Sequence, residues 1–176
     1  MKEILWHGRG GQGAFTAAKL LGAAFALRDD KSFALAFPSF GPERRGAPIR
    51  AFTKLDNKPI GNRSEIEKAD YSIFLDDTLL VSSSLDELKE NGKIIVNTKQ
   101  SFDDERIIAV DADSLAEKVL KRPITNTILL GAFSAVSGEV EISDIENAIK
   151  LYMPQKLHAK NIEAVEQASR LFKEVK

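Results

Sequence analysis

Four of the six residues at positions 8–13 are glycines, within the sequence WHGRGGQG at residues 6–13. Glycine allows the backbone to adopt positive φ and to approach another group closely, and the first N–H groups of a helix have no partner inside that helix. A loop of this kind between a strand and a helix is typical of an anion-binding turn. The candidate anion ligands are Gly8, Arg9, Gly10, Gly11, Gln12 and Gly13.

Gly8, Gly10 and Gly13 also fit the dinucleotide-binding pattern G-x-G-x-x-G. That pattern requires a carboxylate about 20 residues later, at the end of the second strand, to bind the ribose hydroxyls. The second strand expected here, 32–37, ends in proline and serine, and the nearest carboxylates precede it. We therefore expect a phosphate-type loop without a ribose anchor. Two alternatives stay open: the glycines only permit close packing, or the chain is a free-standing NAD(P)-type dehydrogenase, against which the missing carboxylate argues.

A second candidate site lies in the loop at residues 37–48. Three prolines and two glycines exclude regular structure there. Aromatic and arginine side chains on a rigid loop are typical of protein contacts, and arginine also binds carboxylate or phosphate through two hydrogen bonds. We expect a subunit contact or an anion site, with a solvated surface turn as the alternative. Its candidate residues are Phe40, Glu43, Arg44 and Arg45.

Further polar residues stand at the expected ends of strands or at the start of a helix. His7 follows the first strand, Asp76 with Asp77 follows another, and Asn126 precedes an apolar helix. The ends of strands form the rim where open α/β sheets bind ligands. Each residue also has a purely structural explanation, as a packed histidine or as a helix cap. No serine or cysteine adjoins His7 in sequence, so we predict no catalytic residue.

The composition excludes several classes of function. Without cysteine, the chain forms no disulfide, no catalytic thiolate and no thiolate-bound iron–sulfur cluster. The two histidines are far apart, so we predict no metal site. With 25 basic and 26 acidic residues, charge gives no reason to expect nucleic acid or a membrane as partner. We see no signal peptide and no apolar run of the roughly 18 residues that a membrane span needs, so we expect a cytoplasmic protein.

Strand and helix patterns alternate along the 176 residues. Strands are expected at 3–7, 32–37, 71–75, 93–97 and 106–110, and helices at 12–28, 114–121, 125–133, 143–152 and 158–175. Capping boxes at 64–67 and 84–87 predict two more helices, the second ending at 91–92. The alternating stretch 49–55, with a return at 59–60, predicts an edge hairpin. We expect one α/β domain over 1–176, Rossmann-like, with a largely parallel sheet, one antiparallel hairpin and helices on both faces.

The order of these motifs resembles that of the gamma subunits of 2-oxoacid:ferredoxin oxidoreductases, most of all the pyruvate enzymes. The resemblance rests on residues 6–13, 37–38, 41–48, 76, 78–80, 96–97, 126, 129–132 and 160–161. These segments are spread over nearly the whole chain and follow the order of the family.

The resemblance implies a complex that converts a 2-oxoacid and coenzyme A to acyl-CoA and CO2 while reducing ferredoxin. Subunits of alpha, beta and delta type would carry thiamine diphosphate, Mg²⁺ and the iron–sulfur clusters. This chain would then supply assembly contacts, and the glycine loop with Asn126 would be a candidate coenzyme A site. Arg9 is similar to the pyruvate type, whereas Arg45 replaces a small polar residue that is common in the family. The 2-oxoglutarate and branched-chain members stay open as alternatives.

Overall fold

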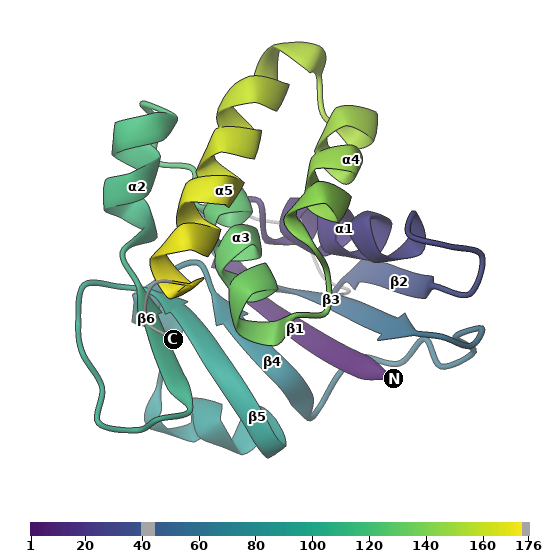
Figure 1. The fold of residues 1–176 in the computed structure, drawn as a ribbon. Coiled ribbons are helices and arrows are strands. Elements are labelled where there is room, and N and C mark those ends of the chain that lie inside the picture. The colour runs from purple at the N-terminus through teal and green to yellow at the C-terminus, as the bar shows by residue number, and fades with distance from the viewer. Residues whose placement is uncertain (40–44, 174–176) are drawn as a thin grey trace.

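The computed structural model describes residues 1–39 and 45–173. Within them lies a six-stranded sheet in the order β2-β3-β1-β4-β5-β6 (Figure 1). The strands are β1 (Lys2–Arg9), β2 (Phe33–Pro38), β3 (Pro48–Asp56), β4 (Ala69–Phe74), β5 (Leu88–Asn97) and β6 (Ile107–Val110). The pairs β1–β4, β4–β5 and β5–β6 are parallel, and β3 runs antiparallel to both of its neighbours. The predicted mixed α/β sheet is confirmed.

The α-helices gather on one face of the sheet (Figure 1). They are α1 (Ala14–Ala26), α2 (Ala112–Val119), α3 (Asn126–Ser137), α4 (Ile142–Tyr152) and α5 (His158–Lys173). Ile4 and Trp6 of β1 join the large core beneath these helices, whereas Leu5 of the same strand packs on the other face. Within the described ranges, no helix has both the length and the apolar character that crossing a bilayer requires.

The opposite face of the sheet is covered by short 3₁₀ helices and irregular segments. These 3₁₀ helices are η1 (Asp77–Leu79) and η2 (Ser82–Glu87), whereas η3 (Gln155–Leu157) belongs to the helical layer. Leu79 and Leu85 pack there against Phe74 and Val96. The prediction of helices on both faces of the sheet is therefore wrong, because the five described α-helices all lie on one face. Among the described residues, 3₁₀ turns and irregular segments cover the other face.

Helix α3 is the most deeply buried helix of the layer, since its first nine residues are all buried. Its apolar sequence has almost no polar side, as expected for a helix covered all round. Gly131 permits the close approach of α5, because a Cβ at that position would lie 2.9 Å from the Cα of Val165. The central place of α3 lets its first residue reach the glycine loop.

The predicted edge hairpin is wrong. Residues 59–60 form no strand, and β3 lies between β2 and β1, so the strand at this edge of the sheet is β2. The charged residue Lys54 made 49–55 look half-solvated, yet residues 51–55 are all buried. Lys54 tolerates burial because the Glu3 carboxylate of β1 lies 3.5 Å from its Nζ. A buried charge is stable only with such a partner.

The two capping-box patterns at 64–67 and 84–87 do not begin α-helices. In the first, no helix forms, and Asn62 accepts hydrogen bonds from the backbone and hydroxyl of Ser64 in a local turn. In the second, only η2 forms before β5 begins at Leu88. The Asn91–Gly92 pair, predicted as a helix end, lies inside β5, where Asn91 has φ 64°. Local side-chain patterns of this kind also suit turns.

Candidate functional site

The glycine loop connects the carboxyl end of β1 to the start of α1. Gly13 is the N-cap of α1 with φ 83°, and Gly11 has φ 98°. Both lie in the left-handed region that favours glycine. A Cβ on Gly13 would also lie 2.6 Å from Nδ2 of Asn126, so no other residue fits there without a shift of its neighbour.

Asn126 is the first residue of α3, 113 positions from Gly13 in sequence. Its Nδ2 donates to the Gly13 carbonyl at 3.3 Å, and its Oδ1 accepts from the backbone N–H of Thr127 at 2.9 Å. Thr125 is the N-cap residue, so the predicted N-cap role of Asn126 is shifted by one position. The buried amide joins the N-termini of α1 and α3.

Gly8 and Gly10 serve close packing and backbone pairing. A Cβ on Gly8 would lie 3.2 Å from the Cβ of Ala14. The N–H of Gly10 donates to the carbonyl of Ala47 at 2.9 Å, and its own carbonyl accepts from the N–H of Gly46 at 3.0 Å. The glycine loop is thus bonded to the end of the proline-rich segment, and the backbone groups of Gly10 are occupied.

Arg9 lies within hydrogen-bonding distance of the carboxylate of Asp76. Its Nε lies 3.0 Å from Oδ2 of Asp76, and its two terminal nitrogens donate to Thr78 Oγ1 and to the Gly46 carbonyl at 2.8 and 3.2 Å. Gln12 adds a bond of 3.2 Å from Nε2 to the same oxygen of Asp76. The predicted anion ligand Arg9 is therefore engaged by a carboxylate of the same chain.

Asp76 remains ionised at neutral pH. Burial raises the pKa of its carboxyl, but hydrogen bonds from Thr78 and Gln12, with the charge of Arg9, outweigh burial and hold the pKa below its usual value. The carboxylate also accepts from the backbone N–H of Thr78 and so caps η1. Both interpretations of Asp76 apply, since it is a helix cap and lies on the rim.

The rim beside the glycine loop is acidic. A cavity of about 450 Å³ there is lined by Gln12 together with Asp76, Asp77 and Asp113. Lys99, the one cation of its lining, lies 3.8 Å from the carboxylate of Asp111 outside the cavity. Three carboxylates repel a phosphate group, so this side of the loop is poorly suited to an anion.

Of the loop predicted as an interface or anion site, Phe40, Glu43 and Arg44 lie outside the described residues. Arg45 is exposed and forms an isolated bridge with Gly10. Its Cγ is 4.0 Å from the position that a Cβ on Gly11 would take, and no other atom of residues 1–39 and 45–173, apart from the neighbours of Gly11 in the chain, comes within 4 Å of that position. The structure thus brings Arg45 beside the one exposed glycine of the loop.

His7 lies on the sheet face opposite the α-helices. Its ring stacks on Phe74 at 4.2 Å, and its Nε2 is 2.8 Å from Oε2 of Glu87. Burial raises the pKa of Glu87, but the hydrogen bond and charge of His7 outweigh it and the pKa falls below its usual value. The interpretation of His7 as packed and hydrogen-bonded is confirmed. Glu87 was not predicted, because 80 residues separate the pair and no local pattern connects them.

The strand order argues against a dinucleotide site of the Rossmann type. In that fold the carboxylate for the ribose stands at the end of a parallel strand near the glycine loop. Here β3 separates β2 from β1 and runs antiparallel to β1, so the carboxyl end of β3 lies beside the start of β1, at the end of the strands away from the glycine loop. The neighbour of β1 on this side therefore presents no carboxyl end to the loop.

Comparison with known families decides the relationship of the chain. Residues 3–171 match the family described as pyruvate ferredoxin/flavodoxin oxidoreductase. The chain belongs to this family.

Relatives in this oxidoreductase family match over nearly their full length. Pyruvate synthase subunit PorC of Methanocaldococcus jannaschii is 47% identical over 171 residues, covering 96% of this chain and 95% of the relative. The pyruvate/ketoisovalerate oxidoreductases common subunit gamma of Pyrococcus furiosus is 42% identical over 178 residues, with the same coverage. The crystal structure of pyruvate oxidoreductase subunit PORC from Thermotoga maritima superposes with a TM-score of 0.82 at 34% identity, covering 96% and 95% of the two chains. The predicted resemblance is confirmed.

The side chains that could ligate a metal are few in this family member. The sequence has no cysteine to ligate a cluster. Among residues 1–39 and 45–173, no group of three or more histidine, aspartate or glutamate side chains is arranged to hold a metal ion. The chain thus lacks the ligands that an iron–sulfur cluster requires.

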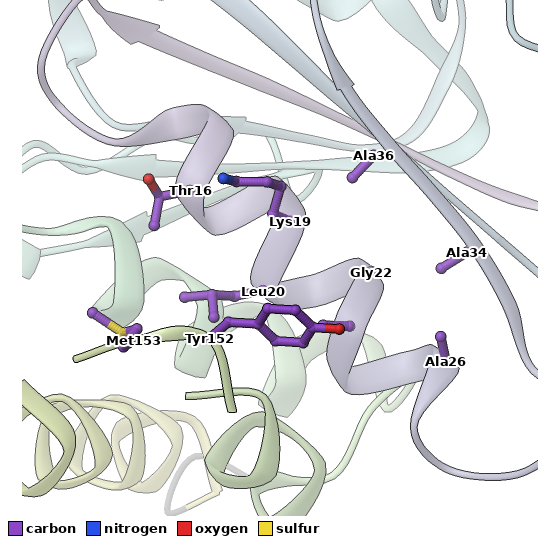
Figure 2. Close-up of a pocket in the computed structure, with 10 residues that line it drawn as sticks. Thr16, Lys19, Leu20, Gly22, Ala26, Ala34, Ala36, Tyr152 and Met153 are labelled. Atoms are coloured by element: carbon purple, nitrogen blue, oxygen red, sulfur yellow. The ribbon is translucent and has the colours of Figure 1, made fainter. Parts of the chain in front are cut away.

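A separate apolar cavity of about 360 Å³ lies between α1, β2 and the end of α4 (Figure 2). Small residues form one side of it, among them Gly22, Ala34 and Ala36, while Tyr152 and Met153 approach from α4. None of the predicted site residues lines this cavity. No local sequence pattern predicts this cavity, because its lining comes from segments more than 100 residues apart.

Proposed function

We propose that this chain is the gamma subunit of a multisubunit 2-oxoacid:ferredoxin oxidoreductase that acts on pyruvate. The complex converts pyruvate and coenzyme A to acyl-CoA and CO2 and reduces ferredoxin. One observation carries the proposal: a pyruvate synthase subunit is 47% identical to this chain over almost the entire length of both. A relative named as common to pyruvate and ketoisovalerate enzymes keeps branched-chain 2-oxoacids as the second substrate class.

In the proposed complex, residues 1–176 form one domain that takes no direct part in the redox chemistry. Partner subunits of alpha, beta and delta type hold thiamine diphosphate, Mg²⁺ and the clusters. The absence of cysteine supports this division of roles. Two ion pairs within the chain also support it. His7 pairs with Glu87 and Arg9 pairs with Asp76, so these polar side chains already have partners in the fold.

We propose that the apolar surface over α1, β2 and α4 contacts another subunit. Leu27, Leu151 and Tyr152 are 47, 60 and 64% exposed. All six residues of β2 are only partly buried, although their sequence is FALAFP. Exposed apolar patches on a folded protein commonly mark protein contacts. The cavity in Figure 2 lies within this surface and would take an apolar side chain of the partner.

For the glycine loop we propose a packing role. Three of the predicted ligand residues are used within the fold, since the N–H of Gly10 bonds to Ala47, Arg9 bonds to Asp76, and Asn126 occupies the space beside Gly13. Contact with coenzyme A is the second candidate function. It is favoured by one observation: the exposed residue Gly11 lies beside the side chain of the cationic residue Arg45.

Co-purification from the native source tests the proposed function. We expect this chain to elute with larger subunits that contain thiamine diphosphate and iron–sulfur clusters. Titration of the isolated chain with NAD(H) and NADP(H) tests the dehydrogenase alternative, for which we expect no binding. Elution as a free chain, together with micromolar dinucleotide binding, would contradict the proposal.

A further inference from the structure

Strand β2 forms one edge of the sheet, with β3 on its inner side (Figure 1). Within residues 1–39 and 45–173, no strand pairs with its outer side. Natural edge strands are commonly protected by charged residues, by bulges or by a very short length. The strand at the other edge, β6, has four residues, whereas β2 has six, and the sequence FALAF at 33–37 contains neither a charge nor a proline. The edge at β2 is therefore open to another strand.

The outward backbone groups of β2 belong to alternate residues. The N–H of Ser39 donates to the carbonyl of Arg50, its opposite residue in the antiparallel register of β2 and β3, at 2.9 Å. In such a pair, residues that bond to the partner strand alternate with residues whose N–H and C=O groups point away from it. Ala34 and Ala36 are an odd number of positions from Ser39, so their N–H and C=O groups point to the outside of the sheet.

The side chains of β2 divide between the two faces of the sheet. Ala34 and Ala36 face α1, because both line the cavity beneath that helix (Figure 2). The odd-numbered side chains of the strand lie on the other face. There Phe37 packs against an apolar cluster of the core, whereas Phe33 and Leu35 join none of the clusters that the described residues form. This face of the edge therefore has apolar side chains left for a contact.

The sequence of β2 is symmetric about Leu35. Residues 33–37 are Phe-Ala-Leu-Ala-Phe and read the same in both directions. When two such strands pair antiparallel about a two-fold axis at Leu35, every residue lies opposite a residue of its own type. In a two-fold contact both copies use the same surface, which must be complementary to itself. This strand meets that requirement.

The backbone and the side chains both suit this register. Ala34 of one copy lies opposite Ala36 of the other, so their outward N–H and C=O groups can exchange hydrogen bonds on both sides of the axis. Leu35 lies opposite Leu35, and Phe33 lies opposite Phe37, in non-hydrogen-bonded pairs where side chains approach most closely. Pro38, which has no N–H to donate, falls just outside the paired residues.

We propose that two copies of this chain pair through β2, antiparallel and centred on Leu35, and so join their sheets into one. The inference rests on the subunit contact proposed above for this surface and names its partner as a second copy. The symmetry about Leu35 favours a second copy, because a strand of a different subunit would not require it. Tyr152 of α4 lines the same cavity as Ala36, so the exposed apolar surface of the helices borders this edge and extends the contact.

Disulfide trapping tests the register, since the chain has no cysteine of its own. When the full chain with Leu35→Cys is oxidised by copper phenanthroline, we expect a covalent dimer. The Cα atoms of opposite residues in a non-hydrogen-bonded pair lie about 4.5 Å apart, within reach of a disulfide. Phe33→Cys chains should join Phe37→Cys chains in a mixture, and neither variant should dimerise alone. Leu171→Cys, at an exposed position on α5, is the control and should stay monomeric.

Analytical ultracentrifugation of the full chain provides a second measurement. We expect the unmodified chain to sediment as a dimer. Leu35→Lys and Leu35→Glu should each raise the dimer dissociation constant at least about tenfold, because like charges directly opposite one another are destabilising. Mixing these two variants should restore the dimer, since opposite charges then face each other. Leu171→Lys should leave the dissociation constant unchanged. Thermal melts show whether each variant is folded, and Leu35→Cys decides the question if a charged variant is not.

Three results would each overturn the proposal: a monomeric unmodified chain, trapping of Leu171→Cys as readily as Leu35→Cys, or dimers of Phe33→Cys alone. Co-elution with the thiamine-binding and cluster-binding subunits is a separate readout. A chain that joins the complex but is not trapped at position 35 contradicts the pairing and leaves the proposed function intact. A trapped dimer that joins no such complex confirms the pairing and contradicts the proposed function.

Discussion

The side-chain amide of Asn126 donates to the Gly13 carbonyl at 3.3 Å and joins the starts of α1 and α3, two helices far apart in sequence. The contact requires both residues. Glycine at 13 supplies the left-handed backbone and the space for the amide, and asparagine at 126 supplies the donor. This relationship explains part of the glycine pattern without a ligand.

Gly13→Ala should lower the free energy of unfolding by about 2–4 kcal/mol, because the methyl group combines left-handed strain with overpacking against Asn126. Asn126→Ala should cost about 1 kcal/mol for its hydrogen bond. In the double variant the clash disappears, so its loss should be smaller than the sum of the two. Urea unfolding measures all three, and a Gly13→Ala variant as stable as the wild type would contradict the packing role.

Asp76→Asn should destabilise the fold by about 1 kcal/mol at pH 7, since it removes the charge that faces Arg9 but preserves the shape. The pKa of Asp76 is lower in the folded state. Its contribution is therefore complete above the unfolded pKa of about 3.9 and is lost as pH falls through the lower, folded value. Thermal melts from pH 7 to pH 2.5 should show the two proteins converging at the acidic end. A constant difference at all pH values would argue against the ion pair.

Gly11→Ala and Arg45→Ala test coenzyme A contact at the glycine loop. If coenzyme A binds there, each change should raise the Michaelis constant for coenzyme A several-fold and leave that for pyruvate unchanged, since the oxoacid reacts elsewhere. The packing role predicts that neither constant changes, with about 1 kcal/mol lost in Gly11→Ala from its φ of 98°. Arg63→Ala, at another exposed arginine, is the control.

Tyr152→Lys should weaken assembly and leave the melting temperature of the isolated chain within about 2 °C, because the side chain is 64% exposed. Gel filtration with the partner subunits measures the assembled fraction. Leu171→Lys places the same charge on another exposed apolar position, on α5. If both variants assemble like the wild type, the surface over α1, β2 and α4 is not a subunit contact.

The sequence predicted the strands and helices whose burial is uniform. Apolar runs such as 71–75 and 128–133 indicate a buried element without further information. The strand and the helix predicted there are β4 and α3. Prediction failed where a partner distant in the sequence allows a charged residue to be buried. Lys54 looked solvated because Glu3, which pairs with it in the buried sheet, is 51 positions away.

The sequence predicted the backbone conformation of the candidate site, but it did not predict the side-chain contacts there. The demand for glycine at positions 11 and 13 follows from the loop type, and both have positive φ. The engagement of Arg9 by Asp76 is a tertiary contact across 67 positions, which no local pattern encodes. For this reason a loop that resembles a phosphate site in sequence has its arginine and the N–H groups of Gly10 and Gln12 bonded within the fold.

Reconstitution of the oxidoreductase with and without this chain tests the central proposal most directly. The measurement is pyruvate-dependent reduction of ferredoxin in the presence of coenzyme A. We predict full activity only when the chain is present and co-elutes with the other subunits. Equal activity without the chain, with the chain recovered only as a free monomer, would contradict the assignment.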